Sequence, residues 1–357
     1  MSSDALARPC SGTAAGVPYV ALPPTAVDAE PTGDTRLVIA WHGMEPPRSA
    51  AAFAAAVPMT GVPVWRVYLE LPMFGTRLPE GGVAEVRARA QRDYLTEFYA
   101  PVVEEAAAEL PATLAELRDQ LGVDVGPIGL AGFSAGAAAA LLVLARGEVP
   151  VSCAALITPI VSPGRLMAAL ERRTGGSHTW TDESREVADR LDLTGLGAQI
   201  VAPNPSIMLV AGAADDLVTP ADVAGFRDLL RAKGGTVVEA ATFKMGHALA
   251  AEPGTEPRPP IAEAVSVDAA LTEWFRTRLA QPVEDQDRIS WADEAAEPED
   301  DDVPIRAPRI VWSDRADLDE VQATPAATPD PAEKQTEPFR IVPARISQQV
   351  LTATVQV

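Results

Sequence analysis

Cysteine and histidine are scarce in this sequence, and their scarcity excludes several kinds of protein. The 357 residues include only two cysteines, Cys10 and Cys153, and three histidines. Two cysteines so far apart in the sequence do not form a disulfide framework. No pair of histidines or cysteines has the spacing of metal ligands, so we expect neither a metal ion nor another cofactor.

Long apolar runs and an excess of positive charge are missing as well. No stretch reaches about 18 uninterrupted apolar residues, and residues 1–16 lack the pattern of a signal peptide. We therefore expect a cytoplasmic protein without a membrane segment. The formal net charge of −21 repels nucleic acids and anionic lipid surfaces, so the expected partner is a small molecule. The sequence does not indicate an oligomeric state.

The chain is rich in apolar residues, and their order predicts the fold class. Hydrophobic residues make up 47% of the sequence, enough to bury a large core. From residue 17 onward, apolar segments with β-branched residues alternate with helical patterns, which is typical of an α/β protein: a mostly parallel sheet with helices on both faces. We expect strands at Val17–Leu22, Arg36–Trp41, Val62–Leu71, Pro127–Phe133, Val151–Ile157, Ser206–Ala211 and Thr236–Phe243.

The helical patterns lie between these strands. The segment Arg92–Leu121 has helical spacing of apolar residues, but Pro101 and Pro111 should start or break helices there, which predicts two or three pieces. The other expected helices are Ala137–Ala145, Pro220–Lys233 and Ile261–Leu279.

Composition divides the chain into three parts: a flexible N-terminus at 1–16, a folded domain at 17–280 and a tail at 281–357. The tail holds 17 acidic against 7 basic residues and many prolines, so we expect it to be disordered. Its short apolar patches, Ile310–Trp312 and Phe339–Val342, are candidate contacts for a protein partner, although a solvated linker is the simpler interpretation.

One segment of the folded domain, 158–205, is too long for a simple crossover between strands. Two short helices are expected in it, Arg165–Arg173 and Asp182–Leu193. We interpret the segment as a lid-like insert over the site, and a surface excursion without a role in chemistry is the alternative.

The most informative motif is Gly-Phe-Ser-Ala-Gly at residues 132–136. It follows an apolar strand and precedes an alanine-rich helix. A serine between two glycines at such a junction can occupy a sharp, strained turn that exposes its hydroxyl. We therefore predict that Ser134 is a nucleophile.

A serine nucleophile needs a base, and the position of His247 favours it among the three histidines. His247 follows the last expected strand, at the same sheet edge as Ser134. The imidazole in turn needs a carboxylate, for which Asp215 is the candidate because it follows the strand Ser206–Ala211. Asp216 is the alternative partner of His247. If it is not the partner, we expect it to be a solvated turn residue or a helix cap.

The expected oxyanion hole uses two backbone amides. One is that of Ala135, which starts the helix after Ser134, and the other is that of Met44, after the turn at Gly43. His42 stands beside this loop, where we expect an orienting hydrogen-bonding role. The candidate substrate contacts are His42, Phe133, His178 and Trp180.

The order Ser134, Asp215, His247, with His42-Gly43 upstream, resembles the α/β-hydrolase superfamily over roughly residues 17–280. The loop Leu71–Arg77 and the Gly-x-Ser-Ala-Gly motif look like those of serine esterases related to dienelactone hydrolases and of prolyl-oligopeptidase-type catalytic domains. The resemblance implies an α/β-hydrolase fold and hydrolysis through an acyl-enzyme. Dienelactone hydrolases proper use cysteine where this chain has Ser134, so their substrate is not implied.

Three functions follow as hypotheses. The first is a serine esterase acting on a small or medium ester. The second is an acyltransferase or thioesterase that uses the same residues, since an acyl-enzyme can be released by an alcohol, an amine or water. The third is a non-catalytic scaffold whose tail binds a partner, because fold alone does not prove activity.

Overall fold

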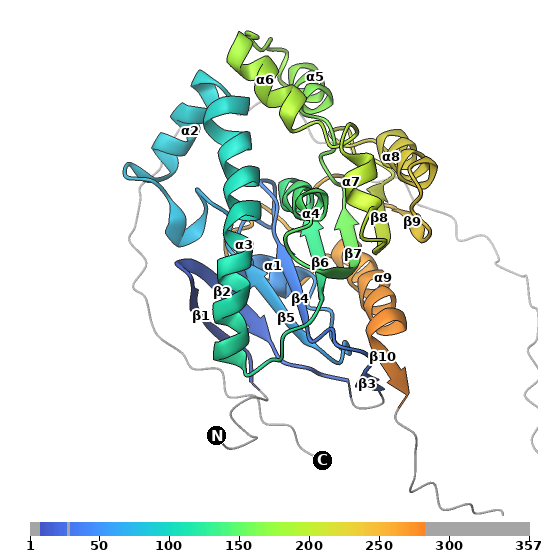
Figure 1. The fold of residues 1–357 in the computed structure, drawn as a ribbon. Helices are drawn as coiled ribbons and strands as arrows, with labels where there is room; N and C mark the ends of the chain where they lie inside the picture. Colours follow the sequence, from blue (N-terminus) through green and yellow to red (C-terminus); the bar gives the residue numbers. More distant parts are fainter. Residues whose placement is uncertain (1–7, 27–28, 283–357) are drawn as a thin grey trace, which may run out of the picture. The chain divides into compact units, whose positions relative to one another are not determined.

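The computed structural model describes residues 8–26 and 29–282 (Figure 1). From residue 283 onward the predicted tail, with both of its apolar patches, lies outside the described residues. The prediction that the tail is disordered therefore stays a prediction.

Eight strands of the described chain form one mostly parallel sheet in the order β1-β2-β5-β4-β6-β7-β8-β9. Only the β1–β2 and β2–β5 pairs are antiparallel. The bounds are β1 Cys10–Ala14, β2 Val17–Leu22, β4 Leu37–Trp41, β5 Trp65–Leu69, β6 Ile128–Phe133, β7 Val151–Ile157, β8 Ser206–Gly212 and β9 Val238–Phe243. A two-stranded sheet pairs β3 (Ala29–Pro31) with β10 (Ala280–Pro282). This architecture confirms the predicted α/β-hydrolase fold.

The ordered structure begins before residue 17, so the prediction of a flexible segment is wrong for Cys10–Ala14. These residues form β1, which pairs with β2 from Cys10 opposite Ala21 to Ala14 opposite Val17. A tight turn joins the two strands, with positive φ at Ala15 (48°) and Gly16 (85°). Two residues with positive φ suit the right-handed twist of a hairpin. The composition of this segment did not indicate the pairing, because β1 is exposed except at Ala14.

The helices cover both faces of the sheet (Figure 1). Their bounds are α1 Ala50–Ala56, α2 Gly82–Arg92, α3 Ala100–Leu121, α4 Ala135–Arg146, α5 Pro163–Thr174, α6 Asp182–Arg190, α7 Gly197–Val201, α8 Pro220–Ala232 and α9 Ala262–Leu279, with a 3-10 turn η2 at Gly75–Arg77 and a π-helical turn η3 at Leu95–Tyr99.

The helix α3 continues through Pro111, so the prediction that this proline breaks the helix is wrong. A proline inside a helix removes one hydrogen bond and costs about 3 kcal/mol or more. Here Leu110 and Leu114 on either side of it are buried in the core, which offsets that cost. Pro101 occupies the first turn of α3, directly after the π-helical turn η3, so it marks the start of a helix, as predicted.

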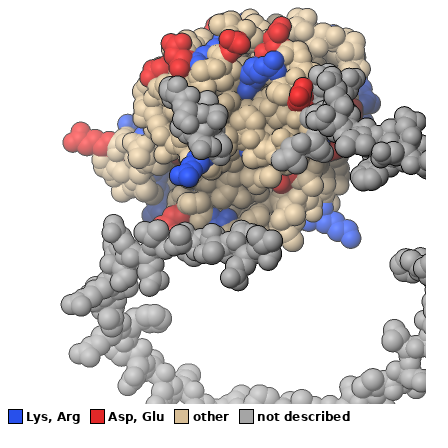
Figure 2. Space-filling view, turned by 90° about the horizontal axis from the view of Figure 1, so that it is seen from below, with Lys and Arg blue, Asp and Glu red and all other residues tan. Residues whose placement is uncertain are grey.

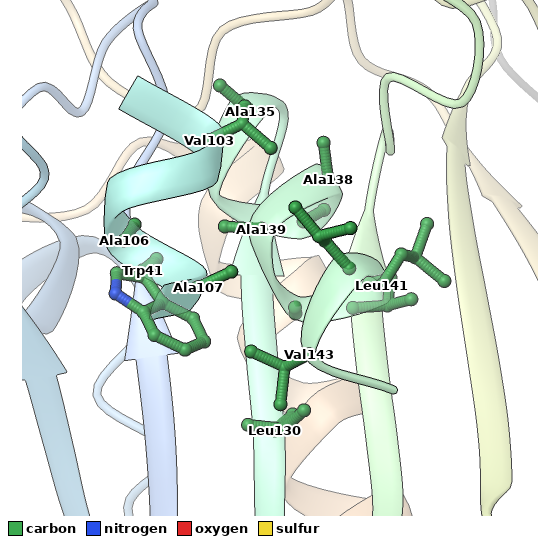
Figure 3. Close-up of a cluster of buried hydrophobic side chains, with 14 of the residues drawn as sticks. Trp41, Val103, Ala106, Ala107, Leu130, Ala135, Ala138, Ala139, Leu141 and Val143 are labelled. Carbon is green, nitrogen blue, oxygen red and sulfur yellow. The ribbon is translucent and has the colours of Figure 1, made fainter. Parts of the chain in front are cut away.

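The core consists of two apolar layers, one on each face of the sheet. Along β4, Leu37, Ile39 and Trp41 point into the layer that contains α3 and α4, while Val38 and Ala40 point into the layer that contains α1 and α9. Figure 3 shows the first layer, where alanines of α3 and α4 allow the two helices to lie close to Trp41 and Leu130. Burial on both faces fixes the central strands firmly, so the loops at their ends start from rigid positions.

The segment 158–205 forms α5, α6 and α7, and the first two are the helices predicted at Arg165–Arg173 and Asp182–Leu193. Figure 1 places α5 and α6 beyond the carboxyl ends of β6 and β7. The candidate site residues lie at the same end of the sheet, so the position of these helices suits a lid. The role of segment 158–205 as a lid remains a prediction.

Surface charge is mixed on the face shown in Figure 2, where acidic and basic side chains lie scattered among uncharged ones. None of the helices in the described ranges is long and apolar enough to cross a membrane.

Candidate active site

Ser134 occupies a strained turn between β6 and α4. Its φ of 54° and ψ of −114° lie outside the regions that a non-glycine residue ordinarily adopts. The surrounding structure holds this conformation, since the Ser134 N–H donates to the Ile157 carbonyl (2.9 Å) and its carbonyl accepts from the Ala138 N–H (3.1 Å). Strain of this kind persists only where neighbours over-determine it, and it is concentrated at functional sites.

The glycines of the motif are required by close approaches of the backbone. A Cβ on Gly136 would lie 2.3 Å from the His42 carbonyl oxygen, and one on Gly132 would lie 2.6 Å from the Ala137 Cα. Gly43 also faces the turn, because a Cβ there would come within 3.1 Å of the Ser134 Cβ. The loop after β4 therefore lies directly against Ser134.

The structure brings Ser134, His247 and Asp215 into one buried chain of hydrogen bonds. His247 Nε2 is 2.8 Å from Ser134 Oγ, and His247 Nδ1 is 2.7 Å from Asp215 Oδ2. The carboxylate can only accept, so Nδ1–H donates to it and Nε2 is left to accept the serine proton. The three residues are 1%, 4% and 5% exposed, so these hydrogen bonds lie in a medium of low dielectric.

Asp215, rather than Asp216, faces the imidazole. Asp215 Oδ1 accepts the N–H groups of Leu217 and Val218, both at 2.9 Å, which leaves Oδ2 directed at His247. Asp216 points outward and forms an ion pair with Arg173. The turn thus aims these two adjacent side chains in different directions.

His42 joins two loops beside Ser134. Its Nδ1 lies 2.8 Å from the Gly43 carbonyl oxygen, and its Nε2 accepts the Leu71 N–H at 3.1 Å. The ring packs edge-on against Phe74, with centroids 5.3 Å apart. These hydrogen bonds suit the orienting role expected for His42, which stays a prediction. Met44, in the same loop, is held at its carbonyl by Arg48 Nε (2.9 Å).

Two of the candidate substrate contacts are closely surrounded by protein. His42 and Phe133 are both fully buried. The Phe133 ring lies 5.5 Å from the His247 ring and against Gly43, so it supports the imidazole from the side of the core. Substrate contact by either residue stays a prediction.

The other two candidates lie in the 158–205 segment. His178 lines a cavity of about 370 Å³, together with residues of α5 and the α2–η3 segment. Its backbone N–H donates to Glu171 (2.6 Å), and its ring contacts Trp180 edge-on at 4.9 Å. His178 Nε2 is buried and has no hydrogen-bond partner among the described residues. A substrate contact by His178 or Trp180 remains a prediction.

Glu70 also lies beside the site, and no sequence motif singles it out. Its carboxylate oxygen Oε1 is 3.2 Å from His42 Nε2. The only available signal was an acidic residue directly after an apolar strand, and such residues are common.

Within residues 8–26 and 29–282, no cluster of acidic, histidine or cysteine side chains is arranged to hold a metal ion.

Part of the chain is similar to a known protein family, and its fold is similar to solved structures. Residues 91–258 match the prolyl oligopeptidase family. None of the curated proteins compared with the chain matches it. Among solved structures, TT1662 from Thermus thermophilus is 20% identical with a TM-score of 0.51, over 75% of this chain and 98% of that one.

Two peptidases have similar structures. A puromycin-hydrolysing peptidase from Mycobacterium tuberculosis is 16% identical with a TM-score of 0.52, over 76% of this chain and 40% of that one. The acylaminoacyl peptidase of Pyrococcus horikoshii is 13% identical with a TM-score of 0.50, over 76% and 41%. The chain thus spans about two fifths of these peptidases, and at such identities the likeness shows the fold alone. These comparisons show an α/β-hydrolase fold, with residues 91–258 similar to the prolyl oligopeptidase family.

Proposed function

We propose that the chain is a serine hydrolase that cleaves a small or medium carboxylic ester through an acyl-enzyme. The observation that carries the proposal is the buried Ser134–His247–Asp215 chain, with Ser134 in a strained turn at a strand-to-helix junction. A serine hydroxyl is a weak nucleophile at neutral pH, and a hydrogen-bonded imidazole overcomes this by taking the proton as the bond forms.

In the proposed mechanism, Ser134 Oγ attacks the ester carbonyl carbon while its proton passes to His247 Nε2. Asp215 Oδ2 holds Nδ1–H, which keeps the tautomer correct and stabilises the imidazolium. The tetrahedral intermediate collapses as His247 returns the proton to the departing alcohol. Water then attacks the acyl-enzyme by the same steps and releases the acid.

The Met44 and Ala135 amides are the proposed donors to the oxyanion. Ala135 opens α4, so its N–H has no acceptor within the helix. The close approach of Gly43 to Ser134 supports the choice of the loop at Met44 as the source of the second donor. Removal of one such donor typically costs about 10²–10³ in kcat.

Amide or peptide hydrolysis is the second candidate, favoured by the match of residues 91–258 to the prolyl oligopeptidase family. The same groups serve that reaction, with an amine in place of the alcohol. An acyl acceptor other than water is a further variant of the same chemistry.

A panel of p-nitrophenyl esters of increasing chain length and of aminoacyl p-nitroanilides tests the proposal. Wild-type protein should turn over one class, and Ser134→Ala should lose that turnover while unfolding at the same temperature. Ser266→Ala, at an exposed position of α9, is the matched control and should behave as wild type. A competing alcohol or amine in the assay reveals acyl transfer by its product. Retained turnover in Ser134→Ala contradicts the proposal, and an inactive wild type favours the scaffold hypothesis.

A further inference from the structure

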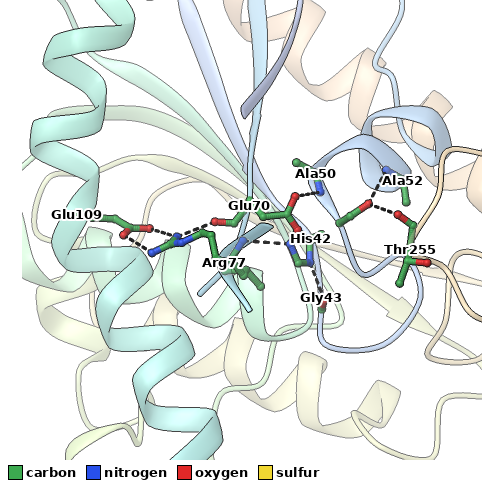
Figure 4. Close-up of polar contacts among 10 residues, drawn as sticks. His42, Gly43, Ala50, Ala52, Glu70, Arg77, Glu109 and Thr255 are labelled. Carbon is green, nitrogen blue, oxygen red and sulfur yellow. Dashed lines mark hydrogen bonds and ion pairs between the residues drawn. The ribbon is translucent and has the colours of Figure 1, made fainter. Parts of the chain in front are cut away.

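Glu70 is a buried carboxylate next to the proposed oxyanion loop. It follows β5 directly and is 8% exposed. The nearby Arg77 does not neutralise it, since its guanidinium donates to the Glu70 backbone carbonyl (2.8 Å) and pairs with Glu109 (2.6 Å) (Figure 4). Arg77 also pairs with Glu105 (2.9 Å). Within the described chain, the one ion-pair contact of the Glu70 carboxylate is with His42.

The two carboxylate oxygens of Glu70 have different surroundings. Oε2 accepts the Ala50 N–H at 3.2 Å. Oε1 is buried, 3.2 Å from His42 Nε2, and has no hydrogen-bond partner among the residues that the structure describes. A Cβ on Gly75 would lie 2.7 Å from the Glu70 carboxyl carbon, so the carboxylate is closely packed in this position.

The hydrogen bonds of His42 show where its protons must be. Gly43 offers a carbonyl oxygen, which only accepts, so Nδ1 carries a hydrogen and donates to it. Nε2 then has a lone pair, which accepts the Leu71 N–H. Nε2 has a single in-plane lone pair, which would be repelled by the lone pairs of Glu70 Oε1 at 3.2 Å in a buried site unless a proton lies between the two atoms. That proton and the Leu71 N–H then share the Nε2 lone pair in a three-centre hydrogen bond.

We propose that Glu70 is a positioning residue that shares a proton with His42 and thereby orients the oxyanion donor at Met44. The step from His42 to Met44 is geometric. The Gly43 carbonyl, held by His42 Nδ1–H, and the Met44 N–H belong to the same planar peptide unit, so fixing one fixes the direction of the other. Arg48 holds the following carbonyl, that of Met44, from the far side.

This inference rests on the proposed function and predicts an effect on the transition state more than on substrate binding. A glutamine at position 70 can donate its amide N–H to His42 Nε2 and accept from Ala50, so it replaces the shared proton. A methionine fills the space and provides no donor. We expect Glu70→Met to lower kcat at least tenfold with little change in KM, and Glu70→Gln to stay within about threefold of wild type.

The experiment compares kcat and KM of Glu70→Met, Glu70→Gln and the control Glu105→Gln on the best substrate of the panel. ¹⁵N NMR of the histidine rings supplies a readout besides activity, and the chain has only three histidines to assign. The ring nitrogen signals of His42 should shift in Glu70→Met and stay in place in Glu70→Gln and Glu105→Gln.

Wild-type kcat and unchanged His42 signals in Glu70→Met overturn the inference. A tenfold loss in a folded Glu70→Gln also overturns it, because the charge would then matter rather than the proton, and this arm decides the question if the methionine variant does not fold. Activity in Ser134→Ala would instead refute the proposed function, so the two failures are distinguishable.

Discussion

The close approach at Gly136 predicts a large effect from one added methyl group. In Gly136→Ala, the new Cβ would lie 2.3 Å from the His42 carbonyl oxygen and 2.5 Å from that of Trp41. Ordinary carbon contacts begin near 3.5 Å, so α4 and the end of β4 must separate by about 1 Å. Both neighbours are backbone atoms, one in the last residue of β4 and one in the buried residue after it, and they cannot turn aside as a flexible side chain would.

Overpacking of this kind costs about 1–3 kcal/mol. With about 2–4 °C per kcal/mol for a domain of this order of size, Tm should fall by roughly 5 °C. The loss of activity should be larger, because the displaced segment carries Ser134 on one side and the oxyanion loop on the other. A misplacement of about 1 Å at reacting groups costs on the order of 100-fold, so we expect kcat to fall by about that factor.

The assay is ester turnover together with calorimetry, and Gly225→Ala is the matched control. Gly225 lies in α8, where an added Cβ meets nothing within 4 Å, so alanine should stabilise the domain by about 0.5–1 kcal/mol and leave kcat unchanged. If Gly136→Ala keeps both its Tm and its kcat, the close packing of the serine turn against β4 does not exist as described.

The remaining predictions concern the proposed triad, the two thiols and a helix cap. Asp215→Asn should lower kcat by about 10⁴ in steady-state assays while the fold is retained, whereas the exposed Asp216→Asn should change it less than about twofold. Burial raises the pKa of the Cys153 thiol to about 11, so the reactive thiolate forms only as the pH rises toward that value. Iodoacetamide at pH 8 should therefore modify the exposed Cys10 and leave Cys153 intact in the native protein, as peptide mass spectrometry would show; equal labelling would contradict the burial. Thr219→Ala removes the capping box of α8 and should destabilise the domain by about 1 kcal/mol in thermal melts.

The sequence predicted those parts of the molecule that depend on local pattern and chain order. The alternation of apolar strands and helices predicts a parallel sheet, and the carboxyl ends of parallel strands meet at one edge. Ser134, Asp215 and His247 each follow such a strand, which is why their proximity could be anticipated without knowing the order of strands in the sheet.

Features that depend on tertiary packing could not be predicted from local sequence patterns. Pro111 looks like a helix breaker until the burial of Leu110 and Leu114 is known. The strand β1 forms because β2 offers a free edge, and its own composition is uninformative. Glu70 meets His42 only because β4 and β5 are neighbours in the sheet, and no local pattern records that pairing.

The most direct test of the account is the site at which a fluorophosphonate reacts. These reagents phosphonylate a serine only where a neighbouring base activates it, and intact mass followed by peptide mapping locates the adduct. We predict one adduct per chain, on the peptide that contains Ser134, and none in Ser134→Ala. An adduct on another serine, or an unmodified wild-type protein under conditions that label a control serine hydrolase, would contradict the claim that Ser134 is an activated nucleophile.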